Sequence, residues 1–261
     1  MKGDIMTGIY MSGTGNTRHC IMRLMYKITG CAKVFAIEDP DSVNALRDAE
    51  EVVLAYPTQF SNIPYMVRDY INKNASLWQD KKVICMATMG AFSGDGAGCA
   101  ARLLTKYGAK IVGGIHIKMP DAVSDSKMLK RSQEENERIV READFKIDRI
   151  AEQMKDGIYP RDGLSAVSHV AGLFGQRLWF YSKTQGYKDN LKISDACCGC
   201  GLCAEGCPMG NIRIVDGKAC AGKSCAMCYR CISRCPKKAI TLLGKEVVEQ
   251  MRYDRYASET E

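Results

Sequence analysis

The sequence predicts a doubly wound α/β domain followed by a small cysteine-rich domain. In the first 155 residues, short apolar runs alternate with amphipathic stretches of helical spacing. Ten of the 14 cysteines, by contrast, fall within residues 197–235. Apolar runs separated by helices indicate a parallel sheet that is covered on both faces. Because no signal-peptide layout precedes them, the concentrated cysteines indicate metal binding rather than disulfides.

The first domain is expected to contain five strand–helix units. The strands of this five-stranded parallel sheet are expected at Ile5–Met11, Val34–Ile37, Val52–Tyr56, Val83–Ala87 and Ile111–Ile117. Helices are expected from the loop after the first strand to Thr29, and over Asp41–Asp48, Ile63–Asn72, Gly98–Tyr107 and Ser126–Met154. A doubly wound sheet binds its ligand outside the carboxyl ends of the strands.

Composition and charge exclude several classes of protein. The chain has 261 residues, of which 46% are apolar and 26% charged, so it can bury the core of one or two domains. No run of 18 apolar residues suits a membrane span. The formal net charge of +7 includes no long basic run of the kind that binds nucleic acid. We therefore expect a cytoplasmic protein with neither a membrane span nor a nucleic-acid partner.

An internal duplication with an offset of 28 residues organises the cysteines. The residues Cys197, Cys200, Cys203, Cys207 and Pro208 recur as Cys225, Cys228, Cys231, Cys235 and Pro236. Each copy spells C-x2-C-x2-C-x3-C-P, which is the spacing of bacterial four-iron clusters. The match continues past the cysteines, where Ile212 and Ile240 begin apolar segments that predict a short strand after each motif.

Other cysteine chemistries fit this pattern less well. A zinc ribbon also pairs C-x2-C knuckles, but it needs four sulfurs per ion rather than three close together and a fourth before a proline. Disulfides would not need two copies of one spacing in register. Cys198 and Cys220 lie outside the repeat. We expect Cys198 to point away from its cluster and Cys220 to be buried, as free cysteines commonly are.

A glycine loop, Ser12-Gly-Thr-Gly-Asn-Thr17, connects the first predicted strand to the first helix. It is not a Walker A loop, and Arg18 stands where a dinucleotide fingerprint has its third glycine. Hydroxyl side chains, two glycines and a helix N-terminus are nevertheless suited to a phosphate group. The alternative is an ordinary strand-to-helix turn. Two further loops, within residues 56–62 and 88–96, leave neighbouring strands and could hold a flat ring, which would complete a mononucleotide site.

On these motifs, the chain resembles two families joined together. Residues 1–155 resemble a flavodoxin domain, in which Ser12–Thr17 matches the FMN phosphate loop. Residues 190–243 resemble a small α+β bacterial ferredoxin with two [4Fe–4S] clusters. The order and length are similar to those of flavodoxin–ferredoxin fusion proteins of anaerobic microbes. The expected divisions are an FMN domain (1–156), an apolar linker or docking segment (157–190), a ferredoxin domain (191–243) and a charged C-terminal tail (244–261).

The resemblance also implies which residues hold the cofactors. The FMN phosphate would contact Ser12, Gly13, Thr14, Gly15, Asn16 and Thr17. The flavin ring would lie between two sets of residues, namely Pro57, Thr58, Gln59, Phe60, Ser61 and Asn62, and Met89, Gly90, Ala91, Phe92, Ser93, Gly94 and Asp95. In such ferredoxins the fourth cysteine of each motif ligates the other cluster. Cluster 1 would therefore take Cys197, Cys200, Cys203 and Cys235, and cluster 2 would take Cys225, Cys228, Cys231 and Cys207.

These cofactors imply a function in electron transfer. FMN exchanges two electrons and can pass them singly, so a chain with both kinds of cofactor can connect two-electron and one-electron reactions. We expect electrons to move between FMN, the clusters and redox partner proteins. The alternatives are a flavin-dependent reductase of a quinone, nitro compound or dioxygen, and a redox or oxygen sensor. The apolar segment 167–181 could dock the two halves of the chain, support a homodimer or bind a partner. No catalytic residue is evident.

Overall fold

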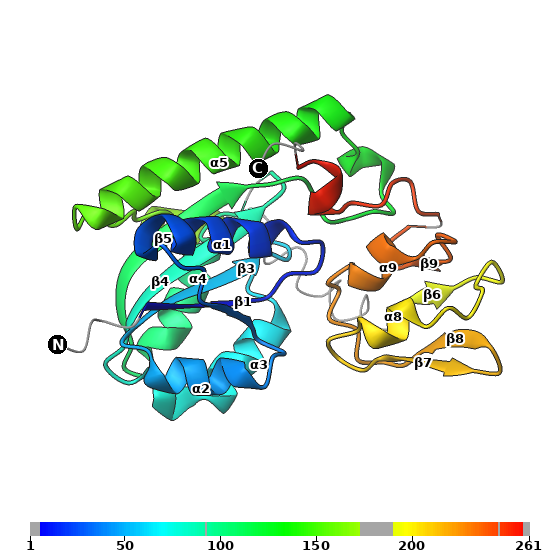
Figure 1. Cartoon of the computed structure of the whole chain (residues 1–261), viewed down its shortest axis with the longest axis horizontal. Coiled ribbons are helices and arrows are strands. Elements are labelled where there is room, and N and C mark those ends of the chain that lie inside the picture. The colour runs from blue at the N-terminus through cyan, green and yellow to red at the C-terminus, as the bar shows by residue number, and fades with distance from the viewer. Residues whose placement is uncertain (1–5, 92, 173–189, 245, 258–261) are drawn as a thin grey trace.

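The protein has two domains that lie side by side (Figure 1). The computed structural model describes residues 6–91, 93–172, 190–244 and 246–257. The larger domain is a sheet between two layers of helices, and the smaller domain contains the cysteine repeat. Among the helices described, the 23-residue α5 included, none is apolar over a length that could cross a membrane.

Five parallel strands form the sheet in the order β2-β1-β3-β4-β5. They are β1 (Met6–Tyr10), β2 (Val34–Ala36), β3 (Glu51–Pro57), β4 (Lys82–Met89) and β5 (Lys110–Lys118). The central strand β3 and its neighbour β4 are buried over nearly their whole length, which explains their unbroken apolar runs. This strand order is that of the flavodoxin-like doubly wound fold. The predicted fold class is confirmed.

Helices cover both faces of the sheet. One face carries α1 (Asn16–Thr29) and α5 (Gln133–Lys155), and the other carries α2 (Asp41–Asp48), α3 (Tyr65–Lys73) and α4 (Gly96–Thr105) (Figure 1). Side chains of β3 alternate between the layers, so that Val53 packs with α1 and α5 while Val52 and Leu54 pack with the other helices. A short 3-10 helix, η1 (Ala75–Trp78), adds the buried Trp78 to the second layer.

The long helix α5 begins later than its amphipathic pattern predicted. The expected start at Ser126 is wrong, because Ser132 caps the helix instead. The Ser132 hydroxyl accepts the N–H of Glu135, and the Glu135 carboxylate accepts the N–H of Ser132. This capping box fixes the N-terminus of the helix. The preceding residues form a 3-10 turn, η2 (Lys127–Leu129), and a loop that reaches the smaller domain.

Residues 158–164 cover the outer edge of the sheet. Gly114 in β5 donates its N–H to the Pro160 carbonyl at 2.8 Å and accepts the N–H of Asp162 at 2.8 Å. The edge strand is thereby protected from pairing with another chain. The helix α6 (Ala166–Gly172) follows. The rest of the predicted apolar segment, from residue 173 to residue 181, lies outside the described residues.

The smaller domain keeps the internal duplication in its fold. Its elements are β6 (Lys192–Ile193), α8 (Leu202–Glu205), β7 (Ile212–Val215), β8 (Lys218–Ala221), α9 (Arg230–Arg234) and β9 (Ile240–Thr241). An offset of 28 residues superimposes the start of α8 on that of α9 and the start of β7 on that of β9. The strand predicted after each motif is therefore confirmed. Because β6 pairs with β9, the first and last parts of the domain are joined.

Asp125, in the loop after β5, joins the two domains. Its carboxylate accepts the N–H groups of Leu242, Leu243 and Gly244 at 2.6, 2.9 and 3.0 Å. It also accepts the hydroxyl of Tyr229 at 2.9 Å. The side chain is 4% exposed, so four donors from the smaller domain converge on one buried charge of the larger domain.

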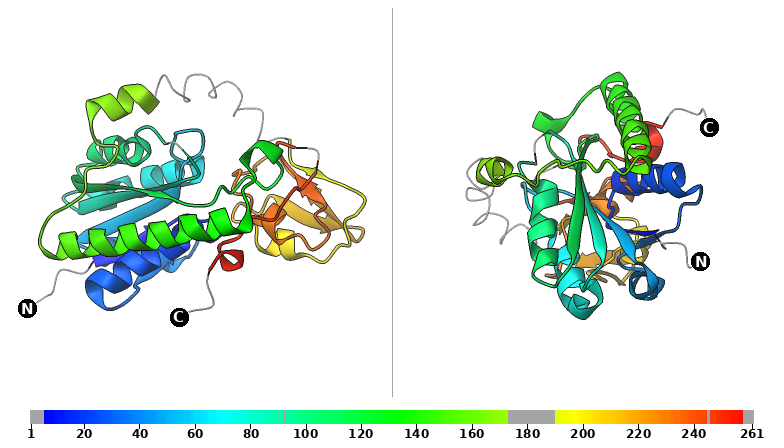
Figure 2. Two further views of the ribbon diagram at one scale, coloured as in Figure 1. Left: turned by 90° about the horizontal axis from the view of Figure 1, so that it is seen from above. Right: turned by 90° about the vertical axis from the view of Figure 1, so that its left-hand side faces the viewer.

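The last described segment, residues 246–257, packs against both domains. Met251 and Tyr256 are buried in the apolar layer beneath α1 and α5. Gln250 donates to the carbonyl of Cys235 at 2.6 Å, and the 3-10 helix η4 (Tyr253–Arg255) lies near the start of α1 (Figure 2). The part of the chain expected to be a charged tail therefore contributes buried side chains to the fold.

Replacing Asp125 with Ala is expected to lower the free energy of unfolding by about 3 kcal/mol, because four donors, two of them buried, would lose their acceptor. Urea unfolding of the purified protein measures this. Asp195→Ala is the control, since Asp195 forms an exposed ion pair with Lys218 and its loss should cost at most about 0.5 kcal/mol. Equal losses in the two variants would contradict the role of Asp125.

Candidate functional site

The loops after β1, β3 and β4 face the smaller domain. These are the loops in which the sequence predicted a ligand, and contacts from the loops after β1 and β3, and from Tyr65 at the start of α3, to residues 224–230 bring the second cysteine motif against them. The carboxyl edge of the sheet therefore lies against the domain that carries the cysteine repeat (Figure 1).

The glycine loop offers groups suited to an anion. Gly15 adopts a left-handed conformation at the N-cap of α1, with a φ of 97°, and no side chain caps the first turn. Ser12 Oγ and Asn16 Oδ1 are buried and have no hydrogen-bond partner among the described residues. Thr17 is held by its hydroxyl contact with Thr88 at 2.7 Å. Free N–H groups at a helix start, beside an unpaired hydroxyl, are the features that bind phosphate.

The loop of residues 57–62 reaches across to the cysteine motif. Phe60 and Ser61 both have positive φ, at 50° and 55°, which is uncommon for non-glycine residues. This turn lets Gln59 point away from the sheet. The Gln59 side chain donates to the carbonyls of Ala226 and Met227, at 2.9 and 3.1 Å. The loop predicted to flank a ring thus also holds the backbone between two cysteines of the repeat.

The loop of residues 89–95 is anchored by polar contacts at its end. Phe92 lies outside the described residues, and Ala91 is exposed. Asp95 is fully buried and pairs with Arg102 and with His169, the latter at 2.9 Å. Ser93 contacts His116 at 3.3 Å. Asp95 therefore ties the loop to α4 and α6 within the protein.

The three histidines all make contacts within the fold. The Nε2 atom of His116 accepts the N–H of Ala97 at 3.1 Å, and burial lowers the pKa of His116. His19 contacts Asp144 at 2.6 Å and stacks on Tyr253, with ring centroids 4.1 Å apart. His169 holds Asp95 as described above. These contacts account for the positions of the three rings.

The eight repeated cysteines line two small cavities. One is lined by Cys207, Cys225, Cys228 and Cys231, and the other by Cys197, Cys200, Cys203 and Cys235 together with Cys198, which lies outside the repeat. Of the repeated cysteines, each cavity therefore receives three from one motif and the fourth from the other copy. Within the described residues, no three His, Cys, Asp or Glu side chains converge as a site for a single metal ion. Cys220 is exposed, so the expectation that it is buried is wrong.

Backbone N–H groups point at several of these sulfurs. Asn211 donates to Cys207 and Ala239 to Cys235, both at 3.3 Å, and these two pairs correspond across the repeat. The N–H groups of Ala219 and Gly199 hold the pKa of Cys197 below its ordinary value.

The two cavities differ in burial. Burial raises the pKa of the Cys228 thiol to about 11, and it raises the pKa of Cys225 and Cys231 as well. Cys198 and Cys200, beside the other cavity, are exposed. The cavity of Cys228 therefore lies inside the molecule, while that of Cys200 reaches its surface.

The more buried cavity lies against the glycine loop. A Cβ atom placed on Gly13 would collide with the backbone oxygen of Cys228, so only glycine permits this approach. Arg230 donates to the Ser12 carbonyl at 2.8 Å and pairs with Glu38. Ala226 is buried in the apolar core of the larger domain. These contacts, and those of Gln59 and Asp125, were not predicted from the sequence.

Comparison with known proteins gives partial matches. No family model matches the chain. It is 31% identical over 77 residues to an uncharacterised ferredoxin of Methanocaldococcus jannaschii, which is 26% of this chain and 49% of the relative. The chain thus spans about half the length of the curated relative that it matches.

Among solved structures, the chain is similar to flavodoxins. The Megasphaera elsdenii flavodoxin has a TM-score of 0.40 and 23% identity, over 45% of this chain and 89% of the other. The Fusobacterium nucleatum flavodoxin, solved with flavin mononucleotide, has a TM-score of 0.41 and 16% identity, over 59% and 98%. The strand order of the larger domain is that of the same fold.

Gly13→Ala is expected to loosen the contact between the domains, at a cost of about 1–3 kcal/mol for the forced overlap. Hydrogen exchange of the amides in residues 224–230 should become faster. Gly113→Ala is the control, because Gly113, like Gly13, does not have positive φ, and a Cβ added there would meet its nearest atom only at 3.4 Å. Unchanged exchange at residues 224–230 in the Gly13 variant would contradict the close approach of Cys228.

Proposed function

We propose that this protein carries electrons between an FMN at the glycine loop, two [4Fe–4S] clusters held by the repeated cysteines, and redox partner proteins. The proposal rests on one observation, which is that the second cysteine motif contacts the glycine loop at Gly13 and Cys228. Electron transfer between cofactors requires that they lie close together. A fold that places a thiol cavity directly on a phosphate-type loop meets this requirement.

The residues of the larger domain fit FMN. Ser12–Thr17 would hold the phosphate through the unpaired Ser12 hydroxyl and the free N–H groups at the start of α1. Residues 57–62 and 89–95 would flank the ring. FMN supplies the ability to take up two electrons and release them singly. The protein's contribution is to hold the ring beside the cysteine motif through Gln59.

The residues of the smaller domain fit two four-iron clusters. Cluster 1 would be held by Cys197, Cys200, Cys203 and Cys235, and cluster 2 by Cys225, Cys228, Cys231 and Cys207. The grouping of these cysteines around two cavities supports the crossed assignment. The C-terminal part of the chain is also where the ferredoxin relative matches. N–H groups aimed at Cys207 and Cys235 would stabilise the thiolates and tune their clusters.

The arrangement also supports an order for the cofactors. The cavity of cluster 2 adjoins the glycine loop, whereas the cavity of cluster 1 reaches the surface at Cys200. We therefore place cluster 2 between FMN and cluster 1. Electrons would enter or leave the protein at cluster 1.

Anaerobic purification tests the proposed cofactors. We expect about eight iron atoms and about eight sulfides per chain, as two four-iron clusters on this motif require, together with one FMN. Reduced protein should show the EPR spectrum of two interacting clusters. Colourless protein, or protein that carries zinc in place of iron, would refute the proposal.

Cysteine variants test the crossed assignment. Cys207→Ser should change the EPR spectrum and iron content in the same way as Cys225→Ser, because the two residues would share cluster 2. Cys235→Ser should instead match Cys197→Ser. If Cys207→Ser matched Cys197→Ser, each motif would hold its own cluster and the crossed assignment would be wrong.

A further inference from the structure

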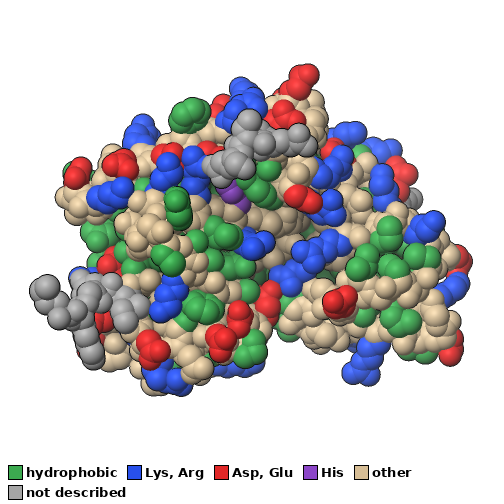
Figure 3. All heavy atoms as spheres, in the orientation of Figure 1, with side chains coloured by type: hydrophobic (Ala, Val, Ile, Leu, Met, Phe, Trp, Pro, Cys, Tyr) green, Lys and Arg blue, Asp and Glu red, His purple; other side chains and the backbone are tan. Residues whose placement is uncertain are grey.

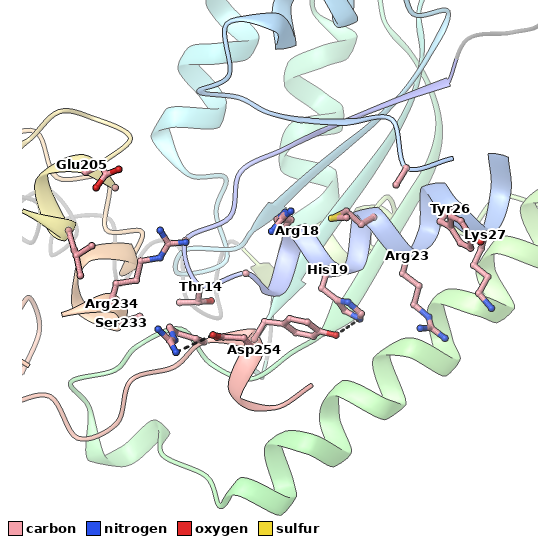
Figure 4. A pocket seen from close by; sticks show the side chains of 18 residues that line it. Thr14, Arg18, His19, Arg23, Tyr26, Lys27, Glu205, Ser233, Arg234 and Asp254 are labelled. Carbon is pink, nitrogen blue, oxygen red and sulfur yellow. Dashed lines mark hydrogen bonds and ion pairs between the residues drawn. The ribbon is translucent and has the colours of Figure 1, made fainter. Parts of the chain in front are cut away.

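A cleft of about 1390 Å³ separates α1 from the smaller domain (Figure 4). It begins at Gly13–Gly15 of the glycine loop, runs along α1 as far as Lys27, and is bounded on the other side by α8, α9 and η4. Both domains and the C-terminal segment therefore contribute to its walls. In the space-filling view, the hollow between the two domains is bordered by Lys and Arg side chains (Figure 3).

The cleft carries more positive than negative groups. Its lining includes five cationic side chains, Arg18, Arg23, Lys27, Arg234 and Arg252, and the two carboxylates Glu205 and Asp254. Three of the cations have acidic partners, since Arg23 and Lys27 contact Asp148 at 2.7 and 3.0 Å and Arg252 contacts Asp254 at 3.1 Å.

Arg18 and Arg234 supply the excess charge. Both side chains are exposed, and neither forms an ion pair with any residue that the structure describes. Arg18 projects from the first turn of α1 and Arg234 from the end of α9 (Figure 4). Two guanidinium groups thus face the cleft from opposite domains, in position to bind carboxylates of a visiting molecule.

One wall of the cleft is also a wall of the cluster 1 cavity. Leu202 lines both the cleft and the cavity of Cys197, Cys200, Cys203 and Cys235. Its side chain is 47% exposed, and the next residue in the chain is the ligand Cys203. Leu202 therefore lies between the cleft and the cavity of cluster 1. Tyr26, 62% exposed, adds a second apolar contact at the α1 wall.

We propose that this cleft docks a partner redox protein through an acidic surface of the partner, and that electrons cross between that partner and cluster 1 past Leu202. The inference rests on the proposed function and identifies the chemistry of the partner. Positive charge spread over two domains, together with exposed apolar side chains, matches a protein surface better than a single small ligand. Charge complementarity of this kind steers association and fixes orientation.

The transfer is a single-electron step. When the partner is the donor, one electron leaves its redox centre, which is oxidised, and enters cluster 1, which is reduced. The same contact serves the opposite direction. No bond forms or breaks, and no proton moves.

Charge reversal in the cleft tests the proposal on the holoprotein. The probe is an acidic two-cluster bacterial ferredoxin, with its Kd measured by calorimetry at low and at physiological ionic strength. The double variant Arg18→Glu/Arg234→Glu should raise this Kd by about tenfold or more and remove most of its salt dependence. The matched control is Arg213→Glu/Lys223→Glu, which reverses two exposed basic residues that do not line the cleft. The control should change the Kd by about twofold or less.

The outcomes separate the cleft from other surfaces and ligands. Loss of affinity in the cleft variant alone supports the proposal. Equal effects in the two variants, or none in either, would overturn it. Binding of tripolyphosphate in the cleft without binding of the ferredoxin would overturn it too, because the occupant would then be a small anion. Iron and FMN content, measured on every variant, show whether the proposed function stands when docking fails.

Discussion

The contact between Gly13 and the backbone of Cys228 limits where the cysteine-rich domain can sit. It brings two loops together at van der Waals distance, which is possible because position 13 has no side chain. Gln59, Arg230 and Asp125 then hold the same surface from three other directions. Each of the three binds at least one backbone group of the opposite domain, so the docking fixes the path of the chain.

Docking also compensates for the small size of the second domain. The large buried aliphatic side chains of its apolar cluster are Ile212, Ile232, Ile240, Leu242 and Val247. A unit of this size is marginally stable without further cross-links. Metal ligation would supply such links from within. The insertion of Asp125 and the return of residues 246–257 to the larger domain supply them from outside.

Local patterns made the strands and the cysteine motifs predictable, but not their junction. The apolar runs of β3 and β4 and the spacing of the cysteines are properties of short segments, and both predictions required no knowledge of distant residues. Asp125 occurs in a segment without special spacing, and Gln59 was expected to flank the flavin ring, so no local pattern predicted the contacts of either residue with the smaller domain. The start of α5 was predicted too early because the pattern of apolar residues continues on the N-terminal side of the cap. Ser132 and Glu135 nevertheless form a recognisable capping box.

Positions at which the two copies of the repeat differ do indicate where the smaller domain contacts the larger one. Tyr229 and Arg230 occupy the positions that Gly201 and Leu202 occupy in the first copy. Tyr229 and Arg230 both bind the larger domain, whereas Leu202 faces the open cleft. Duplication gives two similar cavities, and these substitutions give them different neighbours. If each cavity holds a cluster, one cluster would lie beside the proposed flavin site and the other near the surface. A directed electron path needs this difference between the two clusters.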